Sequence, residues 1–248
     1  MIVIKTDKEV QQMRLAGKIN AQAHELVKQM IKPGISTLEL DRAVEAFIRS
    51  KGGTPAFKGY QGFPASICAS INDEVVHGIP DDRRLKEGDI VSIDIGTIFE
   101  GYVGDSAKTY PVGNISMEAE KLIYYTRKSF YEGIKFAKEG YRLSDISHAV
   151  QKCVEEQGFS VVRDFVGHGI GQKMHEDPQI PNFGKPGRGP RLQKGMVLAI
   201  EPMVNQGTYH VWLLKNDWTV VTRDGKLSAH YEHTIAITDA EPLILTSL

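Results

Sequence analysis

Apolar residues recur at helical spacing in four segments of the chain. Two long segments, 7–31 and 117–138, are amphipathic and predict helices that bury one face. Each of them is followed by a shorter segment with the same periodicity, at 34–52 and at 140–158. The pattern therefore predicts two pairs of helices, each with one long and one short member.

After each pair of helices, the pattern changes to short runs of β-branched and apolar residues, which are typical of strands. The segment 89–111 contains two such runs on either side of Glu100-Gly101, which predicts a β-hairpin. Segments 196–204 and 233–237 predict an equivalent pair of strands, joined by a longer excursion. Helices followed by antiparallel strands, twice over, indicate an α+β fold.

Two pairs of segments also repeat in sequence. The segment 34–52 (GISTLELDRAVEAFIRSKG) matches 140–158 (GYRLSDISHAVQKCVEEQG) at an offset of 106 residues (140 − 34). The segment 85–94 (LKEGDIVSID) matches 192–201 (LQKGMVLAIE) at an offset of 107 residues (192 − 85). Two separate matches in nearly one register predict an internal repeat, and hence two halves related by a pseudo-twofold axis.

The two halves are predicted to form one domain. The chain has 248 residues, of which 41% are hydrophobic and 25% charged, close to the average of globular proteins. No low-complexity linker separates residues 1–110 from 111–248, so we expect a single catalytic domain over 1–248. The stretch rich in proline and glycine after Asp177 is short, and we interpret it as a loop.

Charge and cysteine content restrict the partners and the compartment. The chain carries 30 basic and 31 acidic residues, a formal net charge of −1, which gives no electrostatic footprint for nucleic acid or an anionic membrane. Two cysteines do not make a disulfide framework, and no apolar stretch has the length of a membrane span or a secretory signal. We therefore expect a cytoplasmic protein without nucleic-acid specificity and without membrane association.

Acidic residues occupy the predicted strands of both halves. The repeat places Asp94 and Glu201 at matching positions, Asp105 follows on the returning strand of the hairpin, and Glu232 opens a later apolar strand. Any one of these acids is explained by an exposed edge strand. Four acids converging on one cavity would instead require two divalent cations to balance their charge. A carboxylate-rich set with one imidazole, for which His168 is the candidate, suits Mn, Fe, Co or Zn.

Other kinds of catalytic site lack essential residues. The segment 167–172 (GHGIGQ) has glutamine where a dinucleotide-binding loop needs its last glycine. The segment 175–179 (HEDPQ) has glutamine where a helical zinc-protease motif needs its second histidine. No Gly-x-Ser-x-Gly elbow and no phosphate-binding Gly-Lys-Ser/Thr loop is present. The chemistry that remains is metal-assisted.

Six short motifs identify a family. In order along the chain they are NDEVVHGIP, SIDIG followed by GDSA, GHGIG, MHEDP, IEP and YEHT. Together they resemble type I methionine aminopeptidases over essentially the whole chain. The resemblance implies the "pita-bread" α+β fold, with helices outside and a dinuclear metal site between two related halves. It further implies that Asp94 binds one metal ion, that His168 and Glu201 bind the other, and that Asp105 and Glu232 bridge both.

The same resemblance implies the activity. Members of the family remove the N-terminal methionine from nascent proteins and peptides when the second residue is small. By resemblance, Glu201 acts as general base or acid, His175 contacts the scissile bond, and His77 contacts the substrate backbone. The walls of the methionine pocket are implied to be Tyr60, Phe63, Cys68 and Trp218. Family members commonly have tyrosine at the position of Phe63 and histidine at that of Gln61.

The same resemblance implies the partners of the protein, and three alternative functions remain open. Nascent polypeptide N-termini are the expected partners, with transient ribosome contact, and we expect a monomer. An Xaa-Pro aminopeptidase or prolidase of the same fold is the first alternative, although such chains normally carry a large N-terminal domain. A creatinase-like relative without metal is the second, although those proteins lose the ligands that this chain retains. A non-catalytic peptide- or RNA-binding module is the third.

Overall fold

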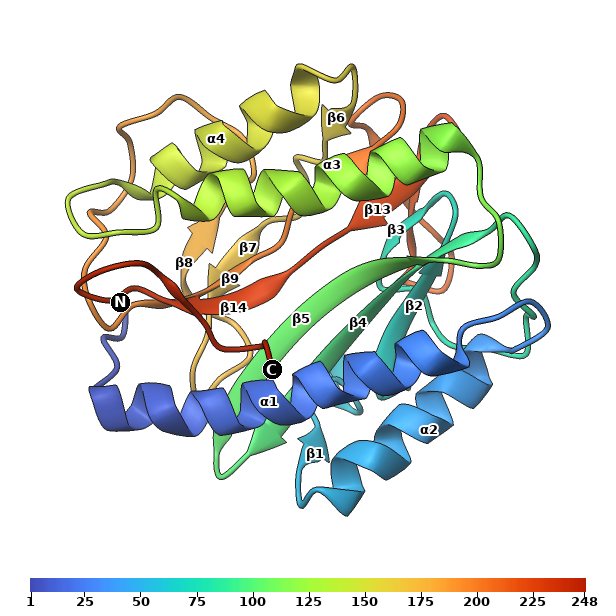
Figure 1. Ribbon diagram of the computed structural model, residues 1–248, viewed down its shortest axis with the longest axis horizontal. Helices are drawn as coiled ribbons and strands as arrows, with labels where there is room; N and C mark the ends of the chain where they lie inside the picture. Colours follow the sequence, from blue (N-terminus) through green and yellow to red (C-terminus); the bar gives the residue numbers. More distant parts are fainter.

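A computed structural model describes all 248 residues. Four helices lie on the outside of the molecule, two on each side of a layer of antiparallel strands (Figure 1). On one side are α1 (Asp7–Met30) and α2 (Thr37–Ser50), and on the other are α3 (Met117–Ile134) and α4 (Leu143–Glu155). No helix has the length and apolarity that a membrane crossing requires. The two predicted pairs of helices are therefore present.

Capping side chains fix where the helices begin. The Ser36 hydroxyl accepts a hydrogen bond from the Glu39 amide, and the Glu39 carboxylate accepts one from the Ser36 amide, which completes a capping box. The Thr6 and Glu9 pair does the same for α1. Helix α3 ends at Ile134, four residues before its predicted end. The amides of the following residues, up to 138, donate to carbonyls two or three residues earlier instead of four, so the α-helical pattern stops.

The first half contributes a four-stranded sheet with the predicted hairpin at its centre. Strands β4 (Ile90–Phe99) and β5 (Tyr102–Pro111) pair antiparallel through ten residues each. Both residues of the Glu100-Gly101 turn have positive φ, 48° and 82°, which matches the right-handed twist of the strands. Strands β1 (Thr54–Pro55) and β2 (Ile67–Ile71) both pair with the other edge of β4, one after the other along its length. The hairpin prediction is confirmed.

The second half contributes a five-stranded sheet in the order β15-β14-β9-β7-β8. The five strands are β15 (Leu243–Ile244), β14 (His233–Ala236), β9 (Val197–Ile200), β7 (Gly167–Gly169) and β8 (Glu176–Ile180). The prediction of a loop directly after Asp177 is wrong in its first residues. Strand β8 contains Pro178, which is tolerated because β8 is the edge of the sheet.

The predicted strand 196–204 is also wrong, because it is divided into two. Strand β9 ends at Ile200, and β10 (Met203–Asn205) belongs to another sheet, with β13 (Ser228–His230) and β6 (Ser160–Val161). Pro202 lacks the amide that would continue the ladder, so the chain changes sheets at Glu201-Pro202. A third small sheet joins β3 (Glu74–Val76), β12 (Val220–Thr222) and β11 (Val211–Leu213).

The two halves repeat hydrogen bonds at the predicted offset. The Leu85 amide donates to the Ile35 carbonyl, and 106–107 residues later the Leu192 amide donates to the Tyr141 carbonyl. The Gly88 amide bonds Val112, and correspondingly the Gly195 amide bonds Ile237. The halves join where Ala107 of β5 and Glu232 exchange backbone hydrogen bonds of 3.3 and 2.8 Å. The strands that carry the acidic residues therefore meet along this seam.

Helix α1 approaches β5 closely because glycine lies on both surfaces. A Cβ atom on Gly17 would lie 2.3 Å from the Leu245 carbonyl oxygen, and one on Gly104 would lie 2.8 Å from the Gly17 nitrogen. Neither position has room for a side chain unless backbone moves. The contact therefore sets how deeply α1 sits on the strand that carries Asp105.

We predict that Gly17→Ala destabilises the protein, although alanine is intrinsically the better helix residue by about 1 kcal/mol. Overpacking against backbone should outweigh that gain and lower the free energy of unfolding by about 1–3 kcal/mol. Urea denaturation measures the change. Lys18→Ala, at the exposed neighbouring position, is the control and should change stability by less than about 0.5 kcal/mol. An unchanged or more stable Gly17→Ala variant would contradict the packing argument.

Candidate active site

A single cavity of about 150 Å³ lies where the strands of the two halves meet. Every site residue predicted from the sequence contributes to its wall. These are Tyr60, Phe63, Cys68, His77, Asp94, Asp105, His168, His175, Glu201, Trp218 and Glu232. Three further residues, Phe57, Gln61 and Met174, complete the lining. Residues that are far apart in sequence thus form one site.

Strand pairing brings the acidic residues together. Asp94 on β4 lies opposite Ala107 on β5, and Ala107 in turn pairs with Glu232. Asp105 lies two residues before Ala107, so it shares the face of the sheet on which Asp94 and Glu232 lie. One ligand atom from each of Asp105, His168 and Glu232 lies within 4.8 Å of the others. The strands therefore hold two acids and an imidazole around one point, with Asp94 on the same face of the sheet.

His168 is held between glycines that the surrounding backbone requires. A Cβ on Gly167 would lie 2.4 Å from the Ala199 carbonyl oxygen, and one on Gly169 would lie 2.0 Å from that of Asp177. His168 Nδ1 bonds the Gly169 carbonyl oxygen at 2.9 Å, which leaves Nε2 as the free nitrogen. Nε2 lies 3.6 Å from Glu201 Oε1. A fixed Nδ1 donor and a free Nε2 are what a metal-binding histidine needs.

The carboxylates are buried without a compensating cation. Burial raises the pKa of Asp94 to about 7, and burial followed by neighbouring carboxylates raises the pKa values of Asp105, Glu201 and Glu232 well above the usual range. Asp94 Oδ1, Asp105 Oδ1 and Glu232 Oε1 are buried and have no hydrogen-bond partner. No lysine or arginine lines the cavity. These orphaned oxygens fit divalent cations, which the site would hold between the carboxylates and His168.

His175 is fixed from two directions. Its Nδ1 lies 2.8 Å from the Tyr60 hydroxyl, and its ring lies 4.3 Å from that of His168 between centroids. The following residue, Glu176, forms a buried 2.6 Å ion pair with Lys5, whose side chain is 3% exposed. The N-terminal segment is thereby attached to the hairpin that carries His175. Nothing in the sequence pattern indicated the ion pair between Lys5 and Glu176.

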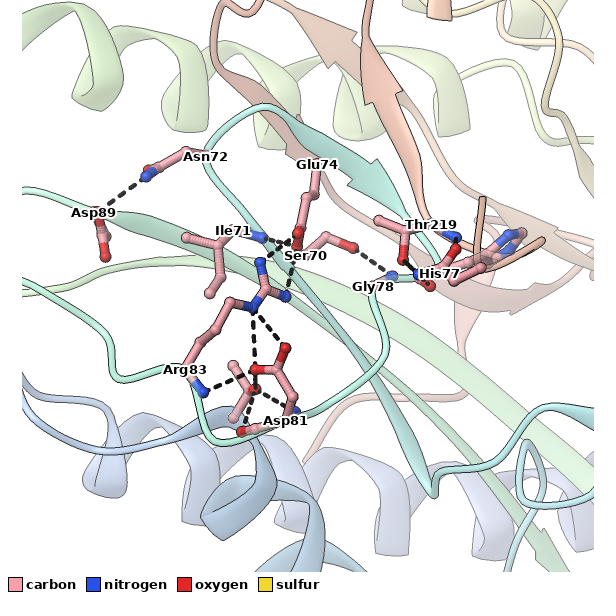
Figure 2. Close-up of polar contacts among 12 residues, drawn as sticks. Ser70, Ile71, Asn72, Glu74, His77, Gly78, Asp81, Arg83, Asp89 and Thr219 are labelled. Carbon is pink, nitrogen blue, oxygen red and sulfur yellow. Dashed lines mark hydrogen bonds and ion pairs between the residues drawn. The ribbon is translucent and has the colours of Figure 1, made fainter. Parts of the chain in front are cut away.

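His77 has a left-handed backbone conformation, with φ of 59°, which is uncommon for a residue other than glycine. Its carbonyl accepts a 3.4 Å hydrogen bond from Thr219, and the next amide, of Gly78, donates to the Ser70 hydroxyl at 3.1 Å. Figure 2 shows these contacts. Burial, and secondarily His175, lowers the pKa of His77 to about 4. The imidazole is therefore neutral at physiological pH.

The segment before His77 is braced by charged side chains (Figure 2). The Arg83 guanidinium lies between Glu74, at 2.6 Å, and Asp81, at 2.8 Å. The Glu74 carboxylate also accepts the Ile71 amide at 2.8 Å. These bonds hold β3 and its following turn against β2, and so fix the direction in which His77 leaves β3.

One end of the cavity is apolar. Phe63 and Trp218 meet edge to face with centroids 5.1 Å apart, and Cys68 packs in the same cluster. Burial, together with the nearby carboxylates, raises the pKa of the Cys68 thiol, so the thiol is neutral and behaves as a small apolar group. An apolar wall beside a polar wall can hold a hydrophobic side chain next to a reacting bond.

The structure adds His230, which the sequence analysis does not single out. Its Nε2 lies 3.8 Å from Glu201 Oε2, is buried and has no hydrogen-bond partner. Burial, and secondarily His77, lowers its pKa to about 3. The available signal was its position two residues before Glu232 on the same face of an extended segment. The His230 imidazole therefore lies next to the Glu201 carboxylate.

Comparison with known proteins identifies the family. Residues 11–239 match metallopeptidase family M24. Methionine aminopeptidase 1 of Bacillus subtilis (strain 168) is 60% identical over 246 residues, which cover 99% of each chain. The crystal structure of methionine aminopeptidase from Thermotoga maritima has a TM-score of 0.98 and 47% identity, with complete coverage of both chains. The chain therefore belongs to metallopeptidase family M24.

Within that family, the relatives that match over the full length are methionine aminopeptidases. The family resemblance drawn from the six motifs is thus confirmed, and so is the pita-bread α+β fold. Prolidase from Pyrococcus furiosus has a TM-score of 0.80 at 23% identity, and the match covers 99% of this chain and 66% of that one. That likeness shows the fold alone. Membership of a metallopeptidase family implies divalent metal ions as cofactors.

We predict that the metal-free protein loses stability as pH rises from 6.5 to 8.5. The four carboxylates have raised pKa values in the folded state, so the folded chain binds more protons than the unfolded chain in this window. Stability then falls with pH, because it falls wherever the native state holds more protons. The site histidines have lowered pKa values, so they add an opposing slope that fades above about pH 7.5, where the imidazoles of the unfolded chain are neutral as well.

Calorimetry of chelator-treated protein should give a Tm at least about 5 °C lower at pH 8.5 than at pH 6.5. Excess Mn²⁺ should remove or reverse this slope, because cations compete with protons for the same oxygens. Asp94→Asn removes one of the titrating groups and should flatten the metal-free slope. A Tm that rises with pH without metal would show that the carboxylates do not repel one another in the folded state.

Proposed function

We propose that this chain is a methionine aminopeptidase that removes the N-terminal methionine from nascent proteins and peptides when the second residue is small. The observation that carries the proposal is the single cavity in which four carboxylates, two of them buried and two half-buried, and His168 lie beside an apolar wall. Family membership and the full-length methionine aminopeptidase relatives support it. We also propose that residues 1–248 form one catalytic domain, because the two halves share this site.

Two divalent ions per chain are the proposed cofactors. Four carboxylates carry a charge of −4, which two divalent cations neutralise, and the absence of lysine and arginine from the lining supports this balance. In this proposal Asp94 would hold one ion, His168 and Glu201 would hold the other, and Asp105 and Glu232 would be shared by both. The donor set suits Co, Mn, Fe or Zn.

Bound divalent ions supply a Lewis acid for the scissile carbonyl and lower the pKa of water to about 7. The chain's own residues do the rest of the chemistry in this proposal. Glu201 takes a proton from the attacking water and passes it to the leaving amine. Asn182 supports its position, since the amide donates a 3.0 Å hydrogen bond to the Glu201 carbonyl.

The two site histidines are proposed to contact the substrate. With Nδ1 of His175 accepting from the Tyr60 hydroxyl, Nε2 carries the proton and donates to the scissile bond. His77 contacts the substrate backbone near the leaving side, from the turn that Thr219 and Ser70 hold. Because burial lowers the pKa values of both histidines, each acts as a neutral hydrogen-bonding group.

The methionine side chain is proposed to occupy the apolar end of the cavity, between Tyr60, Phe63, Cys68 and Trp218. A flexible thioether packs well on aromatic rings, and Phe63 and Trp218 present such a surface. Phe57 and Met174 extend the wall beyond the residues predicted from sequence. A wall around the next residue would admit small side chains and reject bulky ones by steric clash.

Nascent polypeptide N-termini are the proposed partners. Such N-termini first become accessible as chains leave the ribosome, so we propose transient contact with the ribosome in the cytoplasm. We propose that the enzyme acts as a monomer, because one chain contains every residue of the site.

Peptide hydrolysis tests this proposal. With Mn²⁺ or Co²⁺, Met-Ala-Ser should be cleaved and Met-Lys-Ser should be cleaved much less or not at all. Ala-Pro-Ala should remain intact, and chelator should abolish the activity on Met-Ala-Ser. Cleavage of Ala-Pro-Ala alone would overturn the proposal in favour of an Xaa-Pro peptidase. Binding of all three peptides without cleavage would favour a non-catalytic module.

We predict that His175→Ala lowers kcat by about 10²-fold or more, because one positioned hydrogen-bond donor to the reacting group is worth about 10²–10³. The bound metal should remain, as measured by elemental analysis. Tyr60→Phe keeps the ring and removes only the hydroxyl, so its loss should be smaller, about fivefold. His210→Ala, at an exposed position, is the control and should keep full activity. Equal loss of metal and activity in His175→Ala would make His175 a ligand instead.

A further inference from the structure

Thr234 makes an unusual contact across the seam between the two halves. The Asp105 amide donates to Thr234 Oγ1 at 3.1 Å, and the same hydroxyl donates to the Asp105 carbonyl at 2.8 Å. Both residues are buried, and 129 residues separate them in sequence. A single side-chain hydroxyl thus satisfies both backbone groups of a proposed bridging residue.

The Thr234 hydroxyl takes the place of backbone hydrogen bonds that are missing where β5 and the strand after Glu232 move apart. Glu232 pairs with Ala107 of β5 through two backbone hydrogen bonds. Two residues later the backbone of the same strand has turned away, because the Thr234 amide donates to Thr246 Oγ1 at 3.2 Å and its carbonyl accepts from Leu245 at 2.9 Å. Asp105 would then have no partner on this side. The Thr234 hydroxyl fills the gap that the backbone leaves.

A second buried side chain fixes Asp105 from the opposite direction. The Asn20 amide of α1 donates to the Gly104 carbonyl at 3.1 Å and also to the Ile95 carbonyl, while its oxygen accepts from the Ser106 hydroxyl. These bonds hold both neighbours of Asp105. Asn20 does not restrain the distance between β5 and the strand that carries Glu232.

We infer that Thr234 is a positioning residue for the metal site, whose hydroxyl sets the separation between the carboxylates of Asp105 and Glu232. The inference rests on the proposed function, in which these two carboxylates bridge both cations. Without the hydroxyl, β5 loses its only tie to β14 at the level of Asp105 itself. The bridge then loosens, while Asp94 on β4 and His168 on β7 keep their own supports.

Three variants test this role. Thr234→Val keeps the shape of the side chain and removes the hydroxyl, and Thr234→Ser keeps the hydroxyl and removes the methyl group. Thr126→Val is the matched control, because Thr126 is a buried threonine of α3 whose hydroxyl donates to a backbone carbonyl at 2.7 Å. Mn²⁺ binding is measured by calorimetry on metal-free protein, pairing of the bound ions by electron paramagnetic resonance, and folding by thermal unfolding.

For Thr234→Val, we expect binding of the second Mn²⁺ to weaken at least tenfold, as is typical when a group that orients a ligand is lost. The resonance signature of paired ions should be lost at a stoichiometry that gives it in the unmodified chain. Thr234→Ser should stay within about threefold of the unmodified chain. Thr126→Val should bind two ions with unchanged affinity, whatever stability it loses.

Two outcomes overturn the inference. One is a Thr234→Val variant that binds two ions as tightly as the unmodified chain and with the same paired signature. The other is a Thr126→Val variant that loses as much metal affinity, which would show that lost stability alone explains the effect. If the unmodified chain binds no pair of ions, both the inference and the proposed dinuclear function fall. If the unmodified chain binds the pair of ions but the variants give either of the two overturning outcomes, the inference is wrong and the proposed function remains.

Discussion

The electrostatic cost of burying carboxylates is the constraint on which this structure depends. Around one small cavity, Asp105 and Glu232 are buried and Asp94 and Glu201 are half-buried, and the wall offers no lysine or arginine to balance them. A charged carboxylate without a partner is expensive to bury, so each group must either hold its proton or meet a cation. The pKa values of all four carboxyl groups are raised, which favours the protonated form. The buried carboxylate oxygens that have no hydrogen-bond partner are available to bind a cation. The rest of the fold serves to keep the four groups close despite their repulsion.

The pseudo-twofold arrangement explains how such a cluster is kept together. Each half provides a sheet that is packed on its own pair of helices, so each is rigid before the acids are considered. The halves then share a short seam at Ala107 and Glu232, and α1 is seated on that seam by the close approach of Gly17 to Gly104. Repulsion between carboxylates acts across this seam, and the halves are also joined farther away, where β3 pairs with β12. Side-chain bonds that cross the seam, such as that of Thr234, therefore have a larger effect than their number implies.

The sequence predicted the features that depend on local periodicity and on the repeat. The four helices and the hairpin 89–111 were found because their patterns are regular, and Asp94 and Glu201 were singled out because the repeat aligns them. What failed depends on tertiary contacts that leave no periodic pattern in the sequence. Strand β8 was interpreted as a loop because its pairing with β7 leaves no mark in its composition. The buried ion pair of Lys5 with Glu176 was missed for the same reason, since 171 residues separate its partners.

The histidines of the site show a further consequence of burial. Desolvation lowers the pKa values of His77 and His168 to about 4, so neither carries positive charge at neutral pH. They therefore cannot offset the carboxylates, and the whole of that task falls to bound cations. Neutral imidazoles have instead one donor and one acceptor nitrogen, and a fixed partner on one nitrogen determines the role of the other. The Gly169 carbonyl, which can only accept, does this for His168. Burial thus affects the two kinds of group differently. The carboxylates require a proton or a cation, whereas the imidazoles are neutral and each has one nitrogen that donates and one that accepts.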